Sequence, residues 1–349
     1  MTVHNASHGG SGDARAAVRR PALLDVAARA GVSHQTVSRV LNDSPHVAPA
    51  TRAKVRQAID ELGYRRNMSA RALATGRSNV IGVIAPSSTL YGPSAIVAEL
   101  SRAARTAAMT FTVDQLTELD RTSLHDAVDR LLGHGIAGLL MVLPIDAAAE
   151  VVSSVVPDGI PVVTVDRPVT GGVATVSVDQ HAGAVLATEH LLQQGHQTVW
   201  HVAGPVDWND SRAREAGWRD TLAAAGVEEP PVARGDWSPA SGYAAGRMLA
   251  RIPDCTAVFA ANDHMALGIA RALHEAGRDI PGDVGLVGFD GVPESEYFTP
   301  PLTTIDQDFG AVGRAGVELL VEQITGVATT PRSVLIPPTL IERASSRRS

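Results

Sequence analysis

At 349 residues, the chain is too long for one ordinary domain and long enough to bury at least one large core. Its formal net charge of −7 conceals an asymmetry: residues 1–80 hold 12 Arg and Lys against 5 Asp and Glu, and the remainder holds 18 against 32. A basic head on an acidic body favours an anionic polymer as the partner of the head, although a merely solvated charged face is the simpler alternative. The single cysteine, Cys255, excludes an intrachain disulfide framework and a cysteine-rich zinc site.

The first 20 residues are rich in Gly, Ser, Ala and Arg and contain no long apolar run. We therefore expect a disordered tail over 1–20 and not a secretory signal peptide. No later apolar stretch is long enough to span a bilayer without charges or helix breakers. These features predict a cytoplasmic protein.

Residues 23–42 predict two short helices that cross at a tight turn. Ala27 is small where the helices must touch, and Gly31 occupies the turn. Ser33 caps the second helix, whose Val37 and Val40 fill the crossing. The opposite face then carries side chains that can bind base edges in the major groove and phosphates, namely His34, Gln35, Ser38 and Arg39.

A third helix is predicted over 51–62, opened by Pro49 and closed by Gly63, so residues 21–66 form an all-α helix-turn-helix headpiece. Asn67 then caps a short helical segment within 67–77 that stops at Gly76. Because isolated helices below ~12 residues are marginal in water, this hinge segment needs a partner.

From residue 78 onward, short apolar strands alternate with amphipathic helices. Strands are predicted near 79–85, 110–114, 136–143, 161–165, 174–178, 198–203, 256–260 and 284–289. Helices are predicted near 94–107, 122–133, 180–194, 211–225, 239–251, 262–276 and 307–325. This alternation is typical of α/β folds, and so many strands favour two doubly wound parallel sheets, with ligands bound beyond the carboxyl ends of the strands.

Polar residues follow three of these strands: Asp166, Asn262 with Asp263, and Asp290. Together with Arg214 and Trp237, they provide the carboxylates, amide, guanidinium and indole that bind a sugar. For Asp263 we expect only a helix-capping role, and Trp237 taken alone is more often a core residue.

The chain resembles the lac repressor (LacI/GalR) family of bacterial transcription regulators, and in particular the member that gives the family its name. The likeness rests on Asp25-Val26-Ala27, Gly31-Val32-Ser33, 36–42, Ala70-Arg71-Ala72-Leu73 and Ile81-Gly82-Val83. Downstream it includes 93–97, Gly195-His196-Gln197, Ala203-Gly204-Pro205, 235–238, Ala261-Asn262-Asp263, 265–268, 300–305 and Gln307-Asp308-Phe309.

The resemblance implies a homodimer that binds a pseudo-palindromic operator, with a core over 78–343 like that of the periplasmic sugar-binding proteins. One subdomain would comprise about 78–178 and 307–336, and the other about 179–306 and 337–343. The implied DNA-binding residues are Ser33, His34, Gln35, Thr36, Ser38, Arg39, Asn42, His46, Asn67, Ala70, Arg71 and Leu73. Leu73 would insert into the minor groove. The implied ligand-binding residues are Leu90, Pro93, Ser94, Ile96, Asp166, Arg214, Trp237, Asn262, Asp290, Gln307 and Phe309.

The chain also departs from the family pattern. Ala22 and Ala48 stand where helix-capping hydroxyl residues are common, and Val178 replaces a pocket aromatic of the member that gives the family its name. Residues 344–349 contain no apolar heptads and are expected to form a tail without a tetramerisation helix.

By resemblance, a small sugar, first a galactoside and then other β-linked oligosaccharides, would release the repressor from DNA. A purine-like corepressor that tightens DNA binding is the alternative.

An α/β enzyme is the competing class. Gly133, Gly135 and Gly138 match Gly-x-Gly-x-x-Gly, but this stretch leads from a helix into a strand, the reverse of a dinucleotide-binding loop. Lys54 is the only lysine, so no Gly-x-x-x-x-Gly-Lys loop exists, and no hydrolase or zinc-protease motif occurs. His190, His196 and His201 do not share a helical face, which favours ordinary histidines over a metal site. A secreted solute-binding protein is disfavoured by the headpiece. We expect no cofactor, no metal and no membrane partner.

Overall fold

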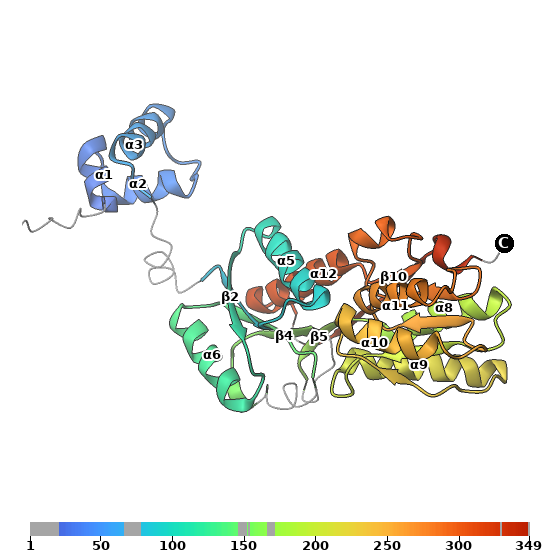
Figure 1. Ribbon diagram of the computed structural model, residues 1–349. Helices are drawn as coiled ribbons and strands as arrows, with labels where there is room; N and C mark the ends of the chain where they lie inside the picture. Colours follow the sequence, from blue (N-terminus) through green and yellow to red (C-terminus); the bar gives the residue numbers. More distant parts are fainter. Residues whose placement is uncertain are drawn as a thin grey trace, which may run out of the picture. The chain divides into compact units, whose positions relative to one another are not determined.

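The protein is described by a computed structural model, which covers residues 21–65, 78–145, 152, 154–165, 172–328 and 330–347. The chain divides into two units, one before and one after the boundary at Gly76 and Arg77 (Figure 1). The hinge segment expected within 67–77 lies outside the described residues. Among the described residues, no helix is both long and apolar enough to cross a bilayer.

The first unit contains the three expected headpiece helices, α1 (Leu23–Ala30), α2 (His34–Leu41) and α3 (Pro49–Leu62). They pack around a small core of Val26, Ala27, Val37, Val40, Val55 and Ala58. Ser33 caps α2 by accepting a hydrogen bond from the Thr36 amide at 3.2 Å, as predicted. Ala22 offers no side-chain cap to α1, but Asp25 Oδ2 accepts a hydrogen bond from the Ala22 amide at 2.7 Å.

The second unit begins with a six-stranded parallel sheet in the order β11-β5-β4-β3-β1-β2. Its strands are β1 (Val80–Pro86), β2 (Thr110–Leu116), β3 (Gly138–Val142), β4 (Val162–Val165), β5 (Ala174–Val178) and β11 (Ser333–Ile336). Helices α5 (Tyr91–Thr106) and α12 (Phe309–Thr325) cover one face, and α6 (Arg121–Gly133) covers the other. We call this sheet and its helices the N subdomain.

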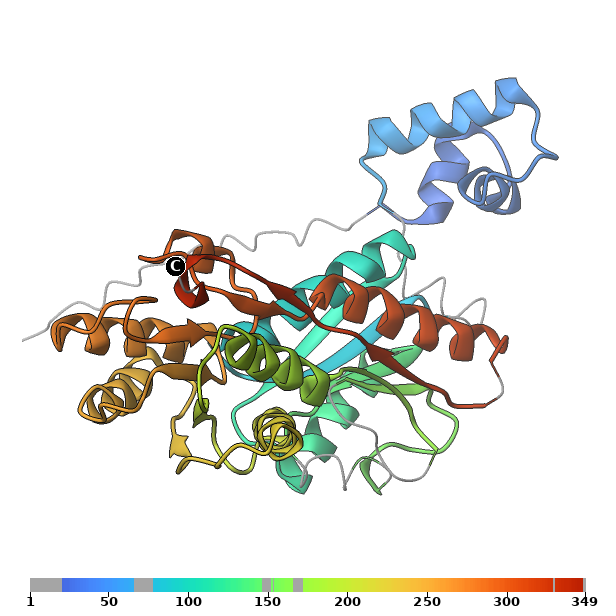
Figure 2. The same cartoon turned by 90° about the vertical axis from the view of Figure 1, so that its right-hand side faces the viewer.

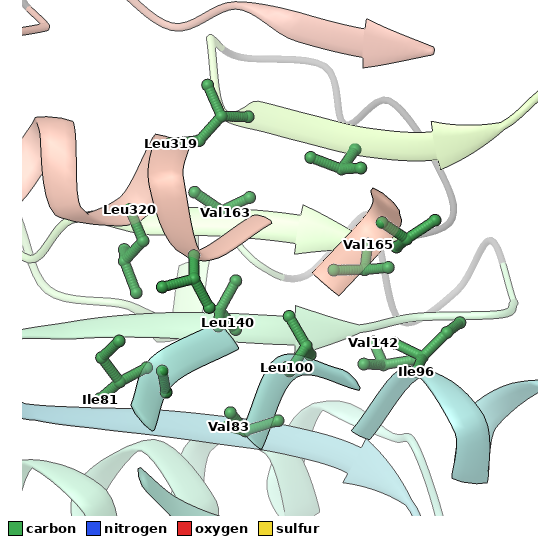
Figure 3. Packing of buried hydrophobic residues seen from close by; sticks show 14 of the residues in the cluster. Ile81, Val83, Ile96, Leu100, Leu140, Val142, Val163, Val165, Leu319 and Leu320 are labelled. Atoms are coloured by element: carbon green, nitrogen blue, oxygen red, sulfur yellow. The ribbon is translucent and has the colours of Figure 1, made fainter. Parts of the chain in front are cut away.

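Helices cover both faces of this sheet, so every residue of the central strands β3 and β5 is buried. Successive residues of a strand point to opposite faces and therefore pack against different helices. Leu140 and Val142 of β3 face α5 and α12, whereas Leu139 and Met141 face α6. Figure 3 shows the first of these interfaces, where Leu100 from α5 and Leu320 from α12 lie over the strands.

A four-stranded parallel sheet in the order β7-β6-β8-β9 forms what we call the C subdomain. Its strands are β6 (Trp200–Ala203), β7 (Ala233–Arg234), β8 (Ala257–Ala260) and β9 (Gly285–Val287). Helices α8 (Gln180–Gln193) and α9 (Asn209–Ala225) cover one face, and α10 (Pro239–Leu249) and α11 (Asp263–Glu275) cover the other. An antiparallel ribbon of β10 (Thr304–Asp306) and β12 (Thr339–Ile341) continues beside β9, preceded by the 3₁₀ helix η1 (Pro293–Tyr297).

Three chain segments connect the two subdomains: β5 to α8, β10 to α12, and β11 to β12. Figure 2 shows the last of them in red, running from one sheet to the other. The doubly wound two-sheet architecture predicted from the sequence is therefore confirmed.

The described residues differ from the sequence predictions in some short strands and in the terminal tail, and agree with them at the glycine-rich turn. The short strands β7, β10, β11 and β12 were not expected, because two to four residues carry too little periodicity. The glycine-rich turn at Gly133–Gly138 closes α6 and opens β3, as interpreted from the sequence order.

The terminal tail expected over 344–349 is corrected in part: residues 344–346 form a short 3₁₀ helix, η2. Ser345 and Ser346 are buried, and Ser345 Oγ donates to the Leu286 carbonyl of β9 at 2.6 Å. Two small hydroxyl side chains can be buried without apolar periodicity once hydrogen bonds satisfy them, so the sequence pattern did not show this segment.

We expect Gly268→Ala to destabilise the C subdomain. A Cβ at this position of α11 would overlap the Pro239 carbonyl oxygen of α10, so the two helix backbones would have to separate. Overpacking of this kind costs about 1–3 kcal/mol in the free energy of unfolding. Thermal and urea unfolding should show the loss, whereas Gly133→Ala, where an added Cβ meets no atom within 4 Å, should be neutral or slightly stabilising. Equal effects of the two substitutions would contradict this explanation.

Candidate nucleic-acid interface and ligand pocket

Helix α2 separates its buried and exposed residues as an amphipathic helix does. Val37 and Val40 are buried in the headpiece core. The predicted DNA-binding residues on and beside this helix are accessible: Ser33, His34, Gln35, Arg39, Asn42 and His46 are exposed, and Thr36 and Ser38 are partly exposed. The exposed His34 imidazole, Gln35 amide and Arg39 guanidinium can enter a groove of DNA. Contact of these residues with DNA is a prediction. Asn67, Ala70, Arg71 and Leu73 lie outside the described residues.

The second unit contains a pocket lined by residues from both subdomains. Nine of the predicted ligand-binding residues line it: Leu90, Pro93, Ile96, Arg214, Trp237, Asn262, Asp290, Gln307 and Phe309. Asp166 lies outside the described residues.

Ser94 was predicted to bind ligand, but it does not line the pocket. It is exposed on α5, and its Oγ donates to the Ser88 carbonyl at 3.2 Å. Each helical residue is rotated by about 100° from its neighbour, so Ser94 points away where Pro93 points in.

Four lining residues were missed from the sequence: Tyr91, Gly92, Trp208 and Asp210. Trp208 and Asp210 follow β6, so the rule that ligands bind beyond the carboxyl ends of parallel strands could have identified them. Tyr91 packs edge-on against Phe309, with ring centroids 5.9 Å apart, and so belongs to the N-subdomain wall of the pocket.

A buried guanidinium is central to the C-subdomain side. The Arg214 side chain is only 3% exposed, and its Nη2 and Nη1 lie 3.6 Å from Asp210 Oδ2 and 3.4 Å from Asp290 Oδ1. Its Nη1 also donates to the Ala261 carbonyl. Its plane packs over the Phe289 ring, 3.8 Å from the centroid. A buried cation needs such compensation, because removal from water costs several kcal/mol.

Asp290 is the acceptor that faces this cation. The pKa of its carboxyl is raised to about 6, chiefly by burial and also by nearby Asp210, whereas Arg214 and Gln307 lower it. Burial likewise raises the pKa of Asp210, and Arg214 opposes it. Two carboxyl groups beside one guanidinium offer a ligand both hydrogen-bond acceptors and a hydrogen-bond donor.

Two indoles form the apolar surface of the pocket. Trp208 and Trp237 meet edge to face, with centroids 5.7 Å apart and planes at 66°. Trp237 has φ 72°, an uncommon backbone conformation for a bulky residue, and its buried Nε1 has no hydrogen-bond partner among the described residues.

Asn262 positions Trp237. Its Nδ2 donates to the Trp237 carbonyl at 3.1 Å, and its Oδ1 caps α11 by accepting from the Met265 amide at 2.8 Å. The structure thus corrects the expectation that Asp263 caps this helix. Asp263 is buried instead and accepts from Thr304 Oγ1 at 2.6 Å and the Val292 amide at 2.8 Å, and burial raises its pKa.

The loop that carries Trp208 also joins the subdomains. The Asn209 amide donates to the Pro144 carbonyl at 2.9 Å, and Trp208 forms a β-bridge with Ile145. A ligand against Trp208 therefore lies next to a direct contact between the two subdomains.

The three histidines considered for a metal do not converge. His201 is buried between Trp218 and Phe259, with centroid distances of 5.3 and 4.7 Å, and burial lowers its pKa to about 4. No group of three potential metal ligands exists among the described residues.

Comparison with known proteins identifies relatives of both parts of the chain. The sequence profile of the lacI family of bacterial regulatory proteins matches residues 22–67, and that of the periplasmic binding protein-like domain matches 188–346. The lactose operon repressor of Escherichia coli is 34% identical over 93% of this chain and 90% of its own length. The transcriptional regulator CelR of Thermobifida fusca is 36% identical over 94% of this chain and 98% of its own.

The solved structures that resemble this chain include structures of the same two regulators. A lac repressor dimer bound to operator and the anti-inducer ONPF matches 95% of this chain and all of its own, at 34% identity and a TM-score of 0.87. A CelR–cellobiose complex matches 93% of this chain and all of its own, at 34% identity and a TM-score of 0.70. The chain belongs to the lacI family of bacterial regulatory proteins and is a DNA-binding transcriptional regulator, not an enzyme.

Proposed function

We propose that this regulator is a repressor that a β-linked disaccharide releases from its operator. The observation that carries the proposal is the composition of the pocket: Asp210, Asp290 and Arg214 supply acceptors and a donor, and Trp208 and Trp237 supply aromatic surface. Sugar hydroxyls pair with such groups, while the C–H face of a pyranose ring packs on an indole.

The position of the pocket supports a role in regulation. Because it is lined from both subdomains, a ligand contacts both, and its affinity depends on how they are arranged. A ligand shifts a conformational equilibrium only by the difference between its affinities for the two states. The proposed sugar therefore stabilises an arrangement in which the DNA-binding state is less favourable.

Two of the solved relatives support a proposal for the sugar and for the assembly. One solved relative is a complex with cellobiose and another is a lac repressor dimer on its operator, so we propose a homodimer that responds to cellobiose or to a galactoside such as lactose. Both sugars are β-linked disaccharides. We propose that the regulator acts in the cytoplasm, where it binds the DNA of the nucleoid.

The test begins by selecting a duplex from a random pool with the full chain. Binding to that duplex is then measured with lactose, cellobiose, the α-linked maltose and hypoxanthine. We expect lactose or cellobiose to weaken binding at least tenfold and maltose to have little effect. Tighter binding with hypoxanthine would instead establish the corepressor alternative, and no response to any sugar would contradict the proposal.

We expect Arg39→Ala to weaken binding to the selected duplex by roughly 5- to 150-fold, since a good base contact is worth about 1–3 kcal/mol. Titrations at several salt concentrations should also show a steep fall in the affinity of the parent chain, as phosphate contacts require. Gln57→Ala, at an exposed α3 position bonded to Glu61, is the control and should bind like the parent. Unchanged duplex binding by Arg39→Ala would contradict the predicted contact between Arg39 of α2 and DNA.

Sugar affinity should fall with acidification below about pH 6. Asp290, whose pKa is raised to about 6, takes up a proton there. One of its two carboxyl oxygens then carries a hydrogen and donates, so the side chain no longer offers two acceptor oxygens. By linkage, binding that needs the carboxylate weakens by at most about tenfold per pH unit. Calorimetry between pH 7.5 and 5 measures the effect.

In Asp290→Asn the sugar should bind more weakly and without the fall in affinity that protonation of Asp290 causes. Asp207→Asn, on the exposed part of the same loop as Trp208, should keep the parent profile. A parent affinity that is constant over this pH range would exclude Asp290 as an acceptor for the sugar.

A further inference from the structure

Two glutamines link two of the segments that connect the subdomains. Gln180 is the first residue of α8, immediately after the β5–α8 connection, and Gln307 lies in the β10–α12 connection. Both are buried, with exposures of 7% and 2%. Gln180 Nε2 donates to Gln307 Oε1 at 2.8 Å, so one side-chain hydrogen bond joins the two connections.

This pair belongs to a longer chain of hydrogen bonds that has a direction. Arg214 Nε donates to Gln180 Oε1 at 2.9 Å, and at the other end Gln307 Nε2 donates to Asp290 Oδ1 at 2.7 Å. Arginine can only donate and an ionised carboxylate can only accept. The two amides therefore have one satisfactory orientation, because reversing either amide places oxygen against oxygen.

The chain closes on itself in the pocket, where Arg214 Nη1 lies 3.4 Å from Asp290 Oδ1. Three of its four members, Arg214, Asp290 and Gln307, line the pocket, and Gln180 does not. Gln180 can therefore respond to a ligand only through the hydrogen bonds that Arg214 and Gln307 make with it.

We propose that Gln180 is a positioning residue that couples occupation of the pocket to the arrangement of the subdomains. The inference rests on the proposed function. A sugar that takes hydrogen bonds from Arg214 or Asp290 changes the partners left to the two amides, and these amides hold the two connections together. Rotation of one subdomain against the other moves these connections, so the Gln180–Gln307 bond contributes differently to the two arrangements.

The test measures coupling and not binding alone. Using the selected duplex, the ratio of duplex Kd values with and without saturating lactose or cellobiose is determined for the full chain, together with the calorimetric Kd of the sugar. Gln180→Met keeps the length of the side chain and removes both hydrogen bonds. Gln180→Glu keeps the acceptor for Arg214 and removes the donor to Gln307.

We expect both variants to lower the coupling ratio at least fivefold, while the sugar-free duplex Kd stays within threefold of the parent. The control Gln193→Met makes the same change at an exposed position of α8 and should keep the parent ratio. Circular dichroism at the assay temperature confirms folding, and Gln180→Glu keeps the test decisive if Gln180→Met does not fold.

Parent-like ratios in folded Gln180→Glu would overturn the proposal, as would an equal loss in Gln193→Met. A parent chain whose duplex binding responds to no sugar would instead contradict the proposed function, and the Gln180 assignment would fall with it.

Discussion

The effector side of this molecule depends on one buried cation. Arg214 lies on α9 with almost no exposure, and each polar group around it comes from a different segment: Asp210 from its own helix, Asp290 from the end of β9, and Gln180 from the start of α8. An uncompensated buried charge would cost several kcal/mol, so these segments must stay in register for the fold to be stable. The same requirement keeps the acceptors in place for a ligand.

The parallel sheets explain why these groups meet. Strand ends of one sheet lie along one edge, so Asp290 after β9, Asn262 after β8 and Trp208 after β6 converge although they are far apart in sequence. The chain crosses between sheets three times, and two of the crossings carry the paired amides of Gln180 and Gln307. The pocket and the connections are thus parts of one hydrogen-bonded structure.

Much of this could be predicted from local pattern. The headpiece helices, eight of the described strands and nine pocket residues follow from periodicity, capping residues, strand-end position and family resemblance. The errors share a cause. Ser94 was assigned to the pocket although helical rotation turns it outward, and Asp263 was assigned a cap that Asn262 provides, because a sequence does not show which of two adjacent residues faces inward.

By itself, the sequence indicated the class of protein, since the spacing of Ala27, Gly31, Val37 and Val40 predicts a tight crossing of two short helices with a polar outer face. It also determined the two-sheet core, because strand and helix periods are local properties. Only the tertiary structure decided that Gln180, distant in sequence from every pocket residue that it serves, bonds to Arg214 and Gln307. Hydrogen-bond partners are set by where the backbone of distant segments is placed, and that placement depends on the packing of the whole core.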